Sequence, residues 1–400
     1  MLAPCRFVAL AAVPALPALL AVIPLVLTVF AAPVHALDRE HRAIAEAAID
    51  RGIDYLRTQQ SDDGSWSPRV GPAITALVLN GMLNEADIAP DDPQAAKAID
   101  YILAQANENG TISAGFLDNY NTAICVSALT RVRGDPRVAE VLDKARLALR
   151  TLQWNGQKDP EGNVVDEDHP WYGGAGYGNS GRPDMSNTQF LTQAMYDLGV
   201  DCKDPVFLRA VAFVSRTQGY SGNDMFADQI VHDGGFIYST SINKDAIGVP
   251  ESKASPDMID EGKAGRPVSG LRTYGSITYA GFKSYVYAQL PPDDPRVEMA
   301  RQWISENYTL ERNPGMPESM KNQGLYYMYL TMARALDADG VTFITTPDGT
   351  RHDWANDLIA KLHELQHEDG SWTNEADRWM EDNPVLVTAY CVIALQHALD

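Results

Sequence analysis

The sequence RGIDYLRTQQSDDGSW at residues 51–66 recurs in altered form as ANDLIAKLHELQHEDGSW at residues 355–372. Both copies carry apolar residues three or four positions apart, which is the spacing of a helix with one buried face. Both then end in Gln-x-x-x-Gly-Ser-Trp. An open stack of repeats needs atypical polar units at its two ends. Here the first and last units resemble each other, which favours a closed ring.

Working outward from these two copies, the dipeptide Asp-Pro opens four further amphipathic segments. An Asp before the first turn of a helix accepts hydrogen bonds from free backbone amides, and Pro is favoured at the first helical position because its missing donor has no partner there. The sequence therefore predicts six helices that start near residues 42, 93, 136, 205, 295 and 353. The four dipeptides are Asp92-Pro93, Asp135-Pro136, Asp204-Pro205 and Asp294-Pro295.

Each of these helices is followed by a second segment that is apolar nearly all round, which indicates burial on both sides. Six such pairs predict an all-α fold, an (α/α)6 toroid with amphipathic helices outside and apolar helices inside, formed by residues 37–400 as one domain. One short β-hairpin is expected over 341–352, around Pro347-Asp348-Gly349. The second segments are residues 74–83, 122–132, 188–199, 276–290, 324–336 and 385–399.

The composition excludes several classes of protein. The 400 residues carry a formal net charge of −21, which is the wrong sign for a nucleic-acid-binding surface. Hydrophobic residues make up 45% of the chain, too many for a disordered chain, and four cysteines are too few for a disulfide scaffold. An acidic globular protein remains.

The N-terminal residues 1–36 differ from the rest of the chain. They contain one Arg, no Asp or Glu, and an apolar run over residues 7–30 that is followed by Val34-His35-Ala36. This pattern predicts a secretory signal peptide that is cleaved after Ala36. The run is also long enough to span a bilayer, so an uncleaved anchor and membrane association through residues 7–30 stay open. Either way the protein is expected to be exported, to the periplasm, the medium or the outer face of the membrane.

The motif Arg51-Gly52-x-x-Tyr55-Leu56-x-x-x-Gln60-x-x-x-Gly64-x-Trp66 resembles the QW repeat of squalene-hopene and oxidosqualene cyclases. Over about residues 40–400 the chain resembles the superfamily of terpenoid cyclases and protein prenyltransferases, with prenyltransferase and squalene-oxidase repeats. The resemblance implies the toroid fold, with Gln capping a neighbouring helix and Trp stacking nearby. It also implies a small apolar, isoprenoid-like ligand.

The catalytic motifs of that superfamily are changed here. Class II cyclases protonate an alkene with the middle Asp of Asp-x-Asp-Asp-Thr, and the matching residues read Asp184-Met185-Ser186-Asn187-Thr188. A serine hydroxyl is too weak an acid for this reaction. The hypothesis is thus an isomerase- or transferase-type cyclase with a degenerate acid motif, or a toroid in which Asp184 and Asn187 merely cap a helix. Val387 replaces the zinc-binding His of prenyltransferases, so no metal and no cofactor are predicted.

Two insertions, residues 154–185 and 219–275, precede inner helices and should lie over the same mouth of the ring. Aromatic rings near the inner helices could stabilise positive charge, stack on sugars or pack as core. Two alternatives stay open beside the isoprenoid ligand: a non-catalytic binding or envelope module, and a carbohydrate-active hydrolase or lyase with paired carboxylates. The catalytic candidates are Asp184 and Asp233. The ligand-binding candidates are Tyr172, Tyr177, Asn187, Arg272, Tyr274, Tyr279, Tyr326, Tyr327, Trp379 and Tyr390.

Overall fold

The computed structural model describes residues 37–178, 181–255 and 270–400, and the chain from Leu37 to Asp400 forms one compact unit. The expected signal peptide or anchor at residues 1–36 lies outside the described residues. Within the described residues, no helix combines the length and the apolar character that crossing a bilayer requires.

The four outer helices with an Asp-Pro start begin at the predicted residues, while α1 begins at Arg39 rather than near 42 and α12 at Trp354 rather than near 353. In all four Asp-Pro pairs the Asp side chain accepts a hydrogen bond from a first-turn amide; Asp92 accepts two, from Gln94 and Ala95. This is the capping geometry that fixes a helix start. The outer helices are α1 (Arg39–Thr58), α3 (Pro93–Ala104), α5 (Pro136–Leu152), α7 (Pro205–Arg216), α10 (Pro295–Asn307) and α12 (Trp354–Leu365).

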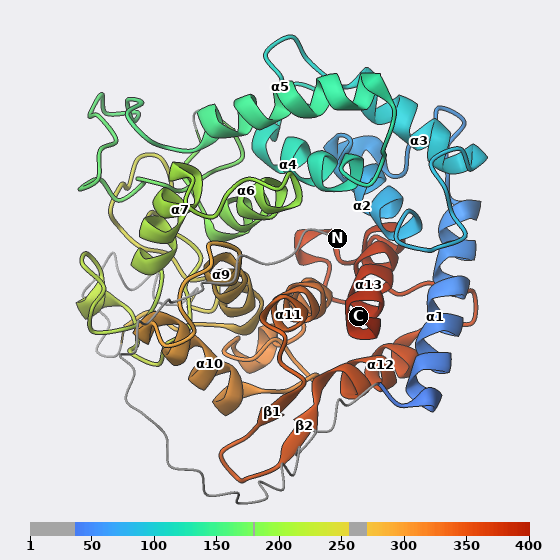
Figure 1. Cartoon of the computed structure of the whole chain (residues 1–400). Coiled ribbons are helices and arrows are strands. Elements are labelled where there is room, and N and C mark those ends of the chain that lie inside the picture. Colours follow the sequence, from blue (N-terminus) through green and yellow to red (C-terminus); the bar gives the residue numbers. More distant parts are fainter. Residues whose placement is uncertain (1–36, 179–180, 256–269) are drawn as a thin grey trace, which may run out of the picture. The chain divides into compact units, whose positions relative to one another are not determined.

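The inner helices close into a ring, as Figure 1 shows. Each packs against the next in chain order, and α13 packs back against α2, so the first and last inner helices are neighbours. Nearly every residue of these helices is buried, since each faces an outer helix on one side and the ring interior on the other. The inner helices are α2 (Ala73–Met82), α4 (Asp118–Leu129), α6 (Met185–Asp197), α9 (Gly275–Tyr287), α11 (Leu325–Asp339) and α13 (Pro384–Leu399).

The expected hairpin lies between the fifth and sixth pairs. Strand β1 (Phe343–Thr345) pairs antiparallel with β2 (Arg351–Asp353), with Ile344 opposite His352. The fold predicted from the sequence is therefore the fold observed: an all-α toroid with one small hairpin in its described part.

A recurring turn ties each unit to the next. The side-chain amide of Gln60 donates to the carbonyl of Gly64, 3.0 Å, and to the carbonyl of Gln94 at the start of α3, 2.9 Å. Gly64 has a φ of +87°, and a Cβ there would lie 2.4 Å from the Lys97 carbonyl oxygen, so only glycine fits. Gln366 makes the equivalent pair of bonds and connects the last unit back to α1 through the Ala48 carbonyl, 2.9 Å, which closes the outer layer as well.

The same bridge occurs in units where the sequence does not show the full motif. Gln153 donates to the carbonyls of Gly173 and Val206, and Gln218 donates to those of Gly234 and Arg296, each at 2.8–2.9 Å. Both glutamines are fully buried. The turns that carry long insertions thus keep the bridge, which holds the insertions against a rigid frame.

Candidate functional site

A pocket with a volume of about 200 Å³ opens among the N-terminal ends of the inner helices. All six inner helices contribute to it, each through its first turns or the loop that leads into it. Each insertion also reaches this mouth, the first through Tyr177 and the second through Tyr238 and Tyr274. The lining is Val70, Ile74, Leu117, Tyr120, Tyr177, Ser186, Phe190, Tyr238, Tyr274, Ser276, Ile277, Tyr327, Trp379, Met380, Glu381, Leu386 and Tyr390.

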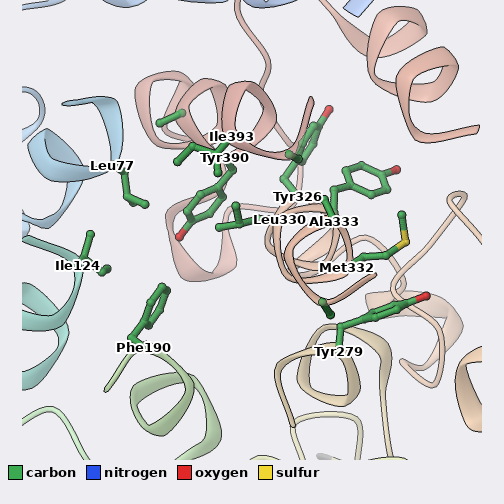
Figure 2. Close-up of a cluster of buried hydrophobic side chains, with 14 of the residues drawn as sticks. Leu77, Ile124, Phe190, Tyr279, Tyr326, Leu330, Met332, Ala333, Tyr390 and Ile393 are labelled. Carbon is green, nitrogen blue, oxygen red and sulfur yellow. The ribbon is translucent and has the colours of Figure 1, made fainter. Parts of the chain in front are cut away.

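An apolar layer lies one helical turn further along the inner helices. Leu77, Ile124 and Leu330 follow the pocket residues Ile74, Tyr120 and Tyr327 by three or four positions, and are thus on the same helix face one turn further along. In Figure 2 these side chains point into the ring, together with Phe190, Tyr390 and Ile393. All six are at most 5% exposed. We refer to Leu77, Ile124, Phe190, Leu330, Tyr390 and Ile393 as the floor of the pocket.

Aromatic rings form a continuous chain around the pocket. Tyr120 lies against Tyr177, with 6.3 Å between ring centroids, and edge-on to Phe190, at 5.4 Å. Phe190 then contacts Tyr327 at 6.2 Å, and Tyr327 contacts Tyr390 at 6.1 Å. Such separations are typical of favourable aromatic pairs. The chain of rings makes the wall apolar and gives it the negative ring faces that attract positive charge.

Glu381 is the one carboxylate among the described residues that line the pocket. It is 1% exposed. One carboxylate oxygen accepts from the backbone N–H of Tyr327 at the start of α11, 2.8 Å, and the other accepts from the Asn374 side-chain amide, 2.6 Å. Burial raises the pKa of Glu381 to about 7, although these hydrogen bonds oppose the shift. A buried carboxyl group that exchanges its proton near neutral pH therefore faces an apolar pocket.

The two residues before Glu381 have left-handed backbone conformations. Trp379 has a φ of +61° and Met380 a φ of +66°, and both line the pocket. Two successive residues of this kind, neither of them glycine, are costly for the chain. Trp379 packs on Gly324, where a Cβ would lie 3.1 Å from the indole ring, and the Arg378 guanidinium lies 4.6 Å from the ring centroid. The turn places a half-exposed indole at the mouth and Glu381 inside it.

Half of the ten ligand-binding candidates from the sequence line the pocket. These five are Tyr177, Tyr274, Tyr327, Trp379 and Tyr390. The other five do not: Tyr172, Asn187, Arg272, Tyr279 and Tyr326.

The five candidates outside the pocket have other surroundings. Tyr172 packs with Trp154 and Trp171 in a small separate cluster, and the exposed Arg272 donates to the Ala254 carbonyl. Tyr326 packs edge-on to Tyr329 within α11. Tyr279 points away from the ring interior in Figure 2. These side chains contribute to packing around the toroid.

Asp184 and Asn187 cap α6, which is the simpler of the two roles that the sequence allows. One oxygen of Asp184 accepts from the Asn187 backbone N–H and the other from its side-chain amide, both at 2.9 Å. Burial raises the pKa of Asp184, and nearby Arg182 partly offsets the shift. Asp184 is 1% exposed and does not line the pocket, whereas Ser186 does.

Asp233 belongs to one of the recurring turns. It accepts from the Gly235 backbone N–H, 3.0 Å, and from the Thr273 hydroxyl, 2.7 Å. Asp63 and Asp369 accept from the residue two positions later in the same way. Burial raises the pKa of Asp233. The geometry gives Asp233 a structural role in its turn, away from the pocket lining.

The opposite end of the inner ring carries polar and charged side chains. Lys283 on α9 is fully buried and donates to the Gln193 side-chain oxygen, 2.8 Å, while the Tyr287 hydroxyl donates to the same atom, 3.1 Å. Burial lowers the pKa of Lys283 well below its ordinary value. These residues lie near the C-terminal ends of their helices, where helix dipoles favour positive charge.

Asp337, His397 and Asp400 form the one group of potential metal ligands among the described residues. Their ligand atoms lie within 4.8 Å of one another, at the C-terminal ends of α11 and α13. The His397 ring already pairs with Asp337 at 2.6 Å, which accounts for part of this proximity. The cluster lies away from the pocket lining.

No protein-family model matches the chain, and no curated protein matches its sequence. The fold is similar to that of the type II terpene cyclase MstE from Scytonema in its apo form, with 14% identity, a TM-score of 0.52, and coverage of 90% of this chain and 98% of that one. An MstE variant in complex with its substrate, geranylgeranyl dihydroxybenzoate, gives a TM-score of 0.53 with the same identity and coverage.

A glycosidase variant is similar as well, with 12% identity, a TM-score of 0.50, and coverage of 91% of this chain and 99% of that one. Identities this low establish the fold and do not carry function. The chain therefore has a terpene-cyclase-like toroid fold. The same fold occurs in a terpene cyclase and in a glycosidase, so evidence for a function has to come from the residues of the pocket.

Proposed function

We propose that this protein binds a small apolar, isoprenoid-like ligand in the pocket at the mouth of its inner ring. The observation that carries the proposal is the lining itself. Eight of its side chains are aromatic, and Ser186, Ser276 and Glu381 are its polar members. A concave, mostly apolar pocket with a few converging polar groups is the usual form of a small-molecule site. The MstE complex with a prenylated substrate has the same fold, which supports this ligand class.

The volume limits the part of the ligand that the pocket encloses. A cavity of about 150 Å³ in a protein core holds one benzene molecule. The pocket, at about 200 Å³, is somewhat larger, so it suits a ring or a short chain of about ten carbon atoms. A longer prenyl chain would extend through the mouth past Tyr177 and Trp379, whose side chains are 42% and 40% exposed.

The geometry supports binding more directly than cyclisation started by Asp184. Both carboxylate oxygens of Asp184 are engaged by Asn187, and Ser186 stands at the pocket in place of an acid. Glu381 faces the pocket, but an acid with a pKa of about 7 is too weak to protonate an alkene. Glu381 is suited instead to accept or return a proton on a polar group of the ligand.

The carbohydrate-active alternative has less support. Glycoside hydrolysis uses two carboxyl groups on either side of the bond that breaks, and Glu381 is the one carboxylate among the described lining residues. The similarity to a glycosidase concerns the fold. Export of the protein, inferred from residues 1–36, remains part of the proposal on sequence grounds.

Native mass spectrometry of the purified chain with prenyl alcohols of ten, fifteen and twenty carbons tests the proposal. We expect one bound molecule per chain, with an affinity that gains little beyond ten carbons because the pocket encloses no more. The Tyr196→Leu variant is the control, because Tyr196 is exposed and stacks on Tyr287 outside the pocket lining. Failure of all three alcohols to bind would contradict the proposal. Binding of short oligosaccharides instead would favour the carbohydrate-active alternative.

A further inference from the structure

The pocket combines aromatic rings from several elements with one buried carboxylate. A positive charge over the face of an aromatic ring is attracted by the ring's negative face, and the attraction grows when the site excludes water. Eight aromatic side chains surround a volume of about 200 Å³, and Glu381 supplies a negative charge at its wall. Such a combination of groups suits an organic cation as well as a hydrocarbon.

The cations of the protein itself leave most of these rings available. Among the described residues, Arg182 and Lys253 lie 5.2 and 4.8 Å from the ring centroid of Tyr238, and Arg378 lies over Trp379. The remaining six rings have no cation over them in the described part of the chain. They are Tyr120, Tyr177, Phe190, Tyr274, Tyr327 and Tyr390. Arg182 and Lys253 are paired with Glu251 and do not line the pocket.

The helix ends around the pocket could instead favour an anion, since helix N-termini carry partial positive charge. Side chains of the protein already occupy five of the six ends. The sixth, α4, begins after Leu117 without a side-chain cap, and its Asn119 N–H donates to the Tyr177 carbonyl, 3.3 Å. Asp184 caps α6, Asn383 caps α13, and Glu381 accepts from the first turn of α11. At α2 and α9, first-turn amides donate to the side-chain oxygens of Asn121 and Asn313. An anionic ligand would find these donors engaged and would meet Glu381 as well.

We propose that this pocket binds a small organic cation, a methylated ammonium group, enclosed by the aromatic rings and paired with Glu381. The inference rests on the proposed function of the pocket as a ligand site, and it goes beyond that function by adding organic cations as a ligand class. A trimethylammonium group has the shape and nearly the size of a branched hydrocarbon, so it fits the same space as an isoprenoid end. The net charge of −21 attracts such cations toward the protein.

Binding of a cation beside Glu381 depends on pH in a definite direction. The cation favours the ionised carboxylate, so affinity rises as the pH passes upward through about 7 and then levels off. Other titratable groups that interact electrostatically with Glu381 are the phenols of Tyr326 and Tyr329 on α11, and the Tyr390 phenol and Cys391 thiol on α13. Burial raises the pKa of each of them, so they stay neutral in this range. Arg378 belongs to the same turn and lies over the Trp379 ring, 4.6 Å from its centroid.

Isothermal calorimetry with choline and its neutral carbon isostere, 3,3-dimethylbutan-1-ol, tests the inference on the full chain at pH 8. The two probes have the same shape and differ in charge. We expect choline to bind at least tenfold more tightly, and its affinity to fall at least fivefold at pH 5.5 while that of the isostere stays constant. In the Glu381→Gln variant the preference for choline should shrink to threefold or less. Tyr196→Leu should behave as wild type.

The outcomes separate this inference from the proposed function. Equal or tighter binding of the neutral isostere overturns the inference, and prenyl-alcohol binding in the same protein would then leave the proposed function standing. If neither probe nor any prenyl alcohol binds, both fail. Should Glu381→Gln not fold, the comparison of the two probes on wild-type protein still decides.

Discussion

The two ends of the inner ring are built from the same six helices and differ in what they place inside. At the N-terminal mouth, aromatic side chains leave a pocket of about 200 Å³ with one buried carboxyl group. At the opposite end, Lys283, Gln193 and Tyr287 form a buried hydrogen-bonded group. The floor of the pocket, defined by Leu77, Ile124, Phe190, Leu330, Tyr390 and Ile393, lies between them. We propose that the mouth receives a ligand, whereas hydrogen bonds at the other end link α9 to α6.

The difference follows from the direction of the helices. All six inner helices have their N-termini at the mouth, so the long loops that precede them gather there and can supply side chains such as Trp379 and Tyr238. The C-terminal ends carry partial negative charge, which suits Lys283. A ring of parallel helices therefore gathers its long loops at one end, and loops on a rigid scaffold often carry function.

The largest effect on stability is expected when a side chain in the floor of the pocket is truncated. Leu330→Ala removes a side chain that is 1% exposed, and such a change costs about 2–5 kcal/mol of unfolding free energy because it leaves a cavity. Tyr177→Ala at the mouth removes a larger but half-exposed side chain, and should cost less than about 1 kcal/mol. Urea unfolding of both variants measures the difference. Equal costs would contradict the division between a packed floor and an open mouth.

The next largest effect is expected in the pH dependence of stability, which should differ between the mouth and the opposite end. Burial raises the pKa of Glu381 from its ordinary 4.5 to about 7, so the folded state binds more protons than the unfolded state between these values. The free energy of unfolding therefore falls as the pH rises from 4.5 to 7, by up to roughly 3 kcal/mol from this group. Glu381→Gln should lose this fall, as measured by denaturant unfolding at several pH values. The same pH slope in wild type and variant would show that Glu381 is not buried as described.

Lys283 at the opposite end should behave in the opposite sense. Its pKa is lowered by burial, so the folded state binds fewer protons than the unfolded state and stability from this group rises with pH up to about 10. Lys283→Met should stabilise the protein at pH 7 by roughly 1–2 kcal/mol, because a methionine is buried at no cost in charge. The gain should shrink as the pH approaches 10. A destabilised variant at pH 7 would mean that the bond to Gln193 outweighs the burial of the amine.

The smallest expected effect concerns backbone strain at the two ends. Gln289 after α9 is exposed with a φ of +53°, and Met380 at the mouth has a φ of +66°. Glycine relieves this strain, so Gln289→Gly should gain about 1 kcal/mol of stability. Met380→Gly should gain less, because a lining side chain is lost, and should weaken ligand binding severalfold. Equal ligand affinity in both variants would show that the turn at Met380 does not contribute to ligand binding.

The sequence predicted the fold well because its signals are local. Asp-Pro caps fix the outer helix starts within a residue, and the all-round apolar segments identify the inner helices. The start of α4 lies at Asp118, earlier than the predicted 122, because its cap is Leu117 in a left-handed conformation with no side-chain hydrogen bond. That turn has no recognisable signal in the sequence.

The site was only partly predictable, because it depends on which way each helix is rotated. Tyr326 and Tyr327 are adjacent, but successive residues on a helix point about 100° apart, so only Tyr327 reaches the pocket. Nothing in the sequence separates Glu381 from the nearby acids Glu375 and Asp377. Its burial depends on Asn374 and the N-terminus of α11, which meet only in the folded ring.

The most direct test of ligand binding in this pocket is a variant whose new side chain fills it. Ser186→Phe places a ring in the space at the mouth, and calorimetric titration with a ten-carbon prenyl alcohol compares this variant with wild type. We predict one molecule bound per wild-type chain and at least a tenfold loss of affinity in Ser186→Phe, with the thermal unfolding midpoint essentially unchanged. Undiminished binding to a folded Ser186→Phe variant would show that the ligand lies elsewhere and would contradict the central claim.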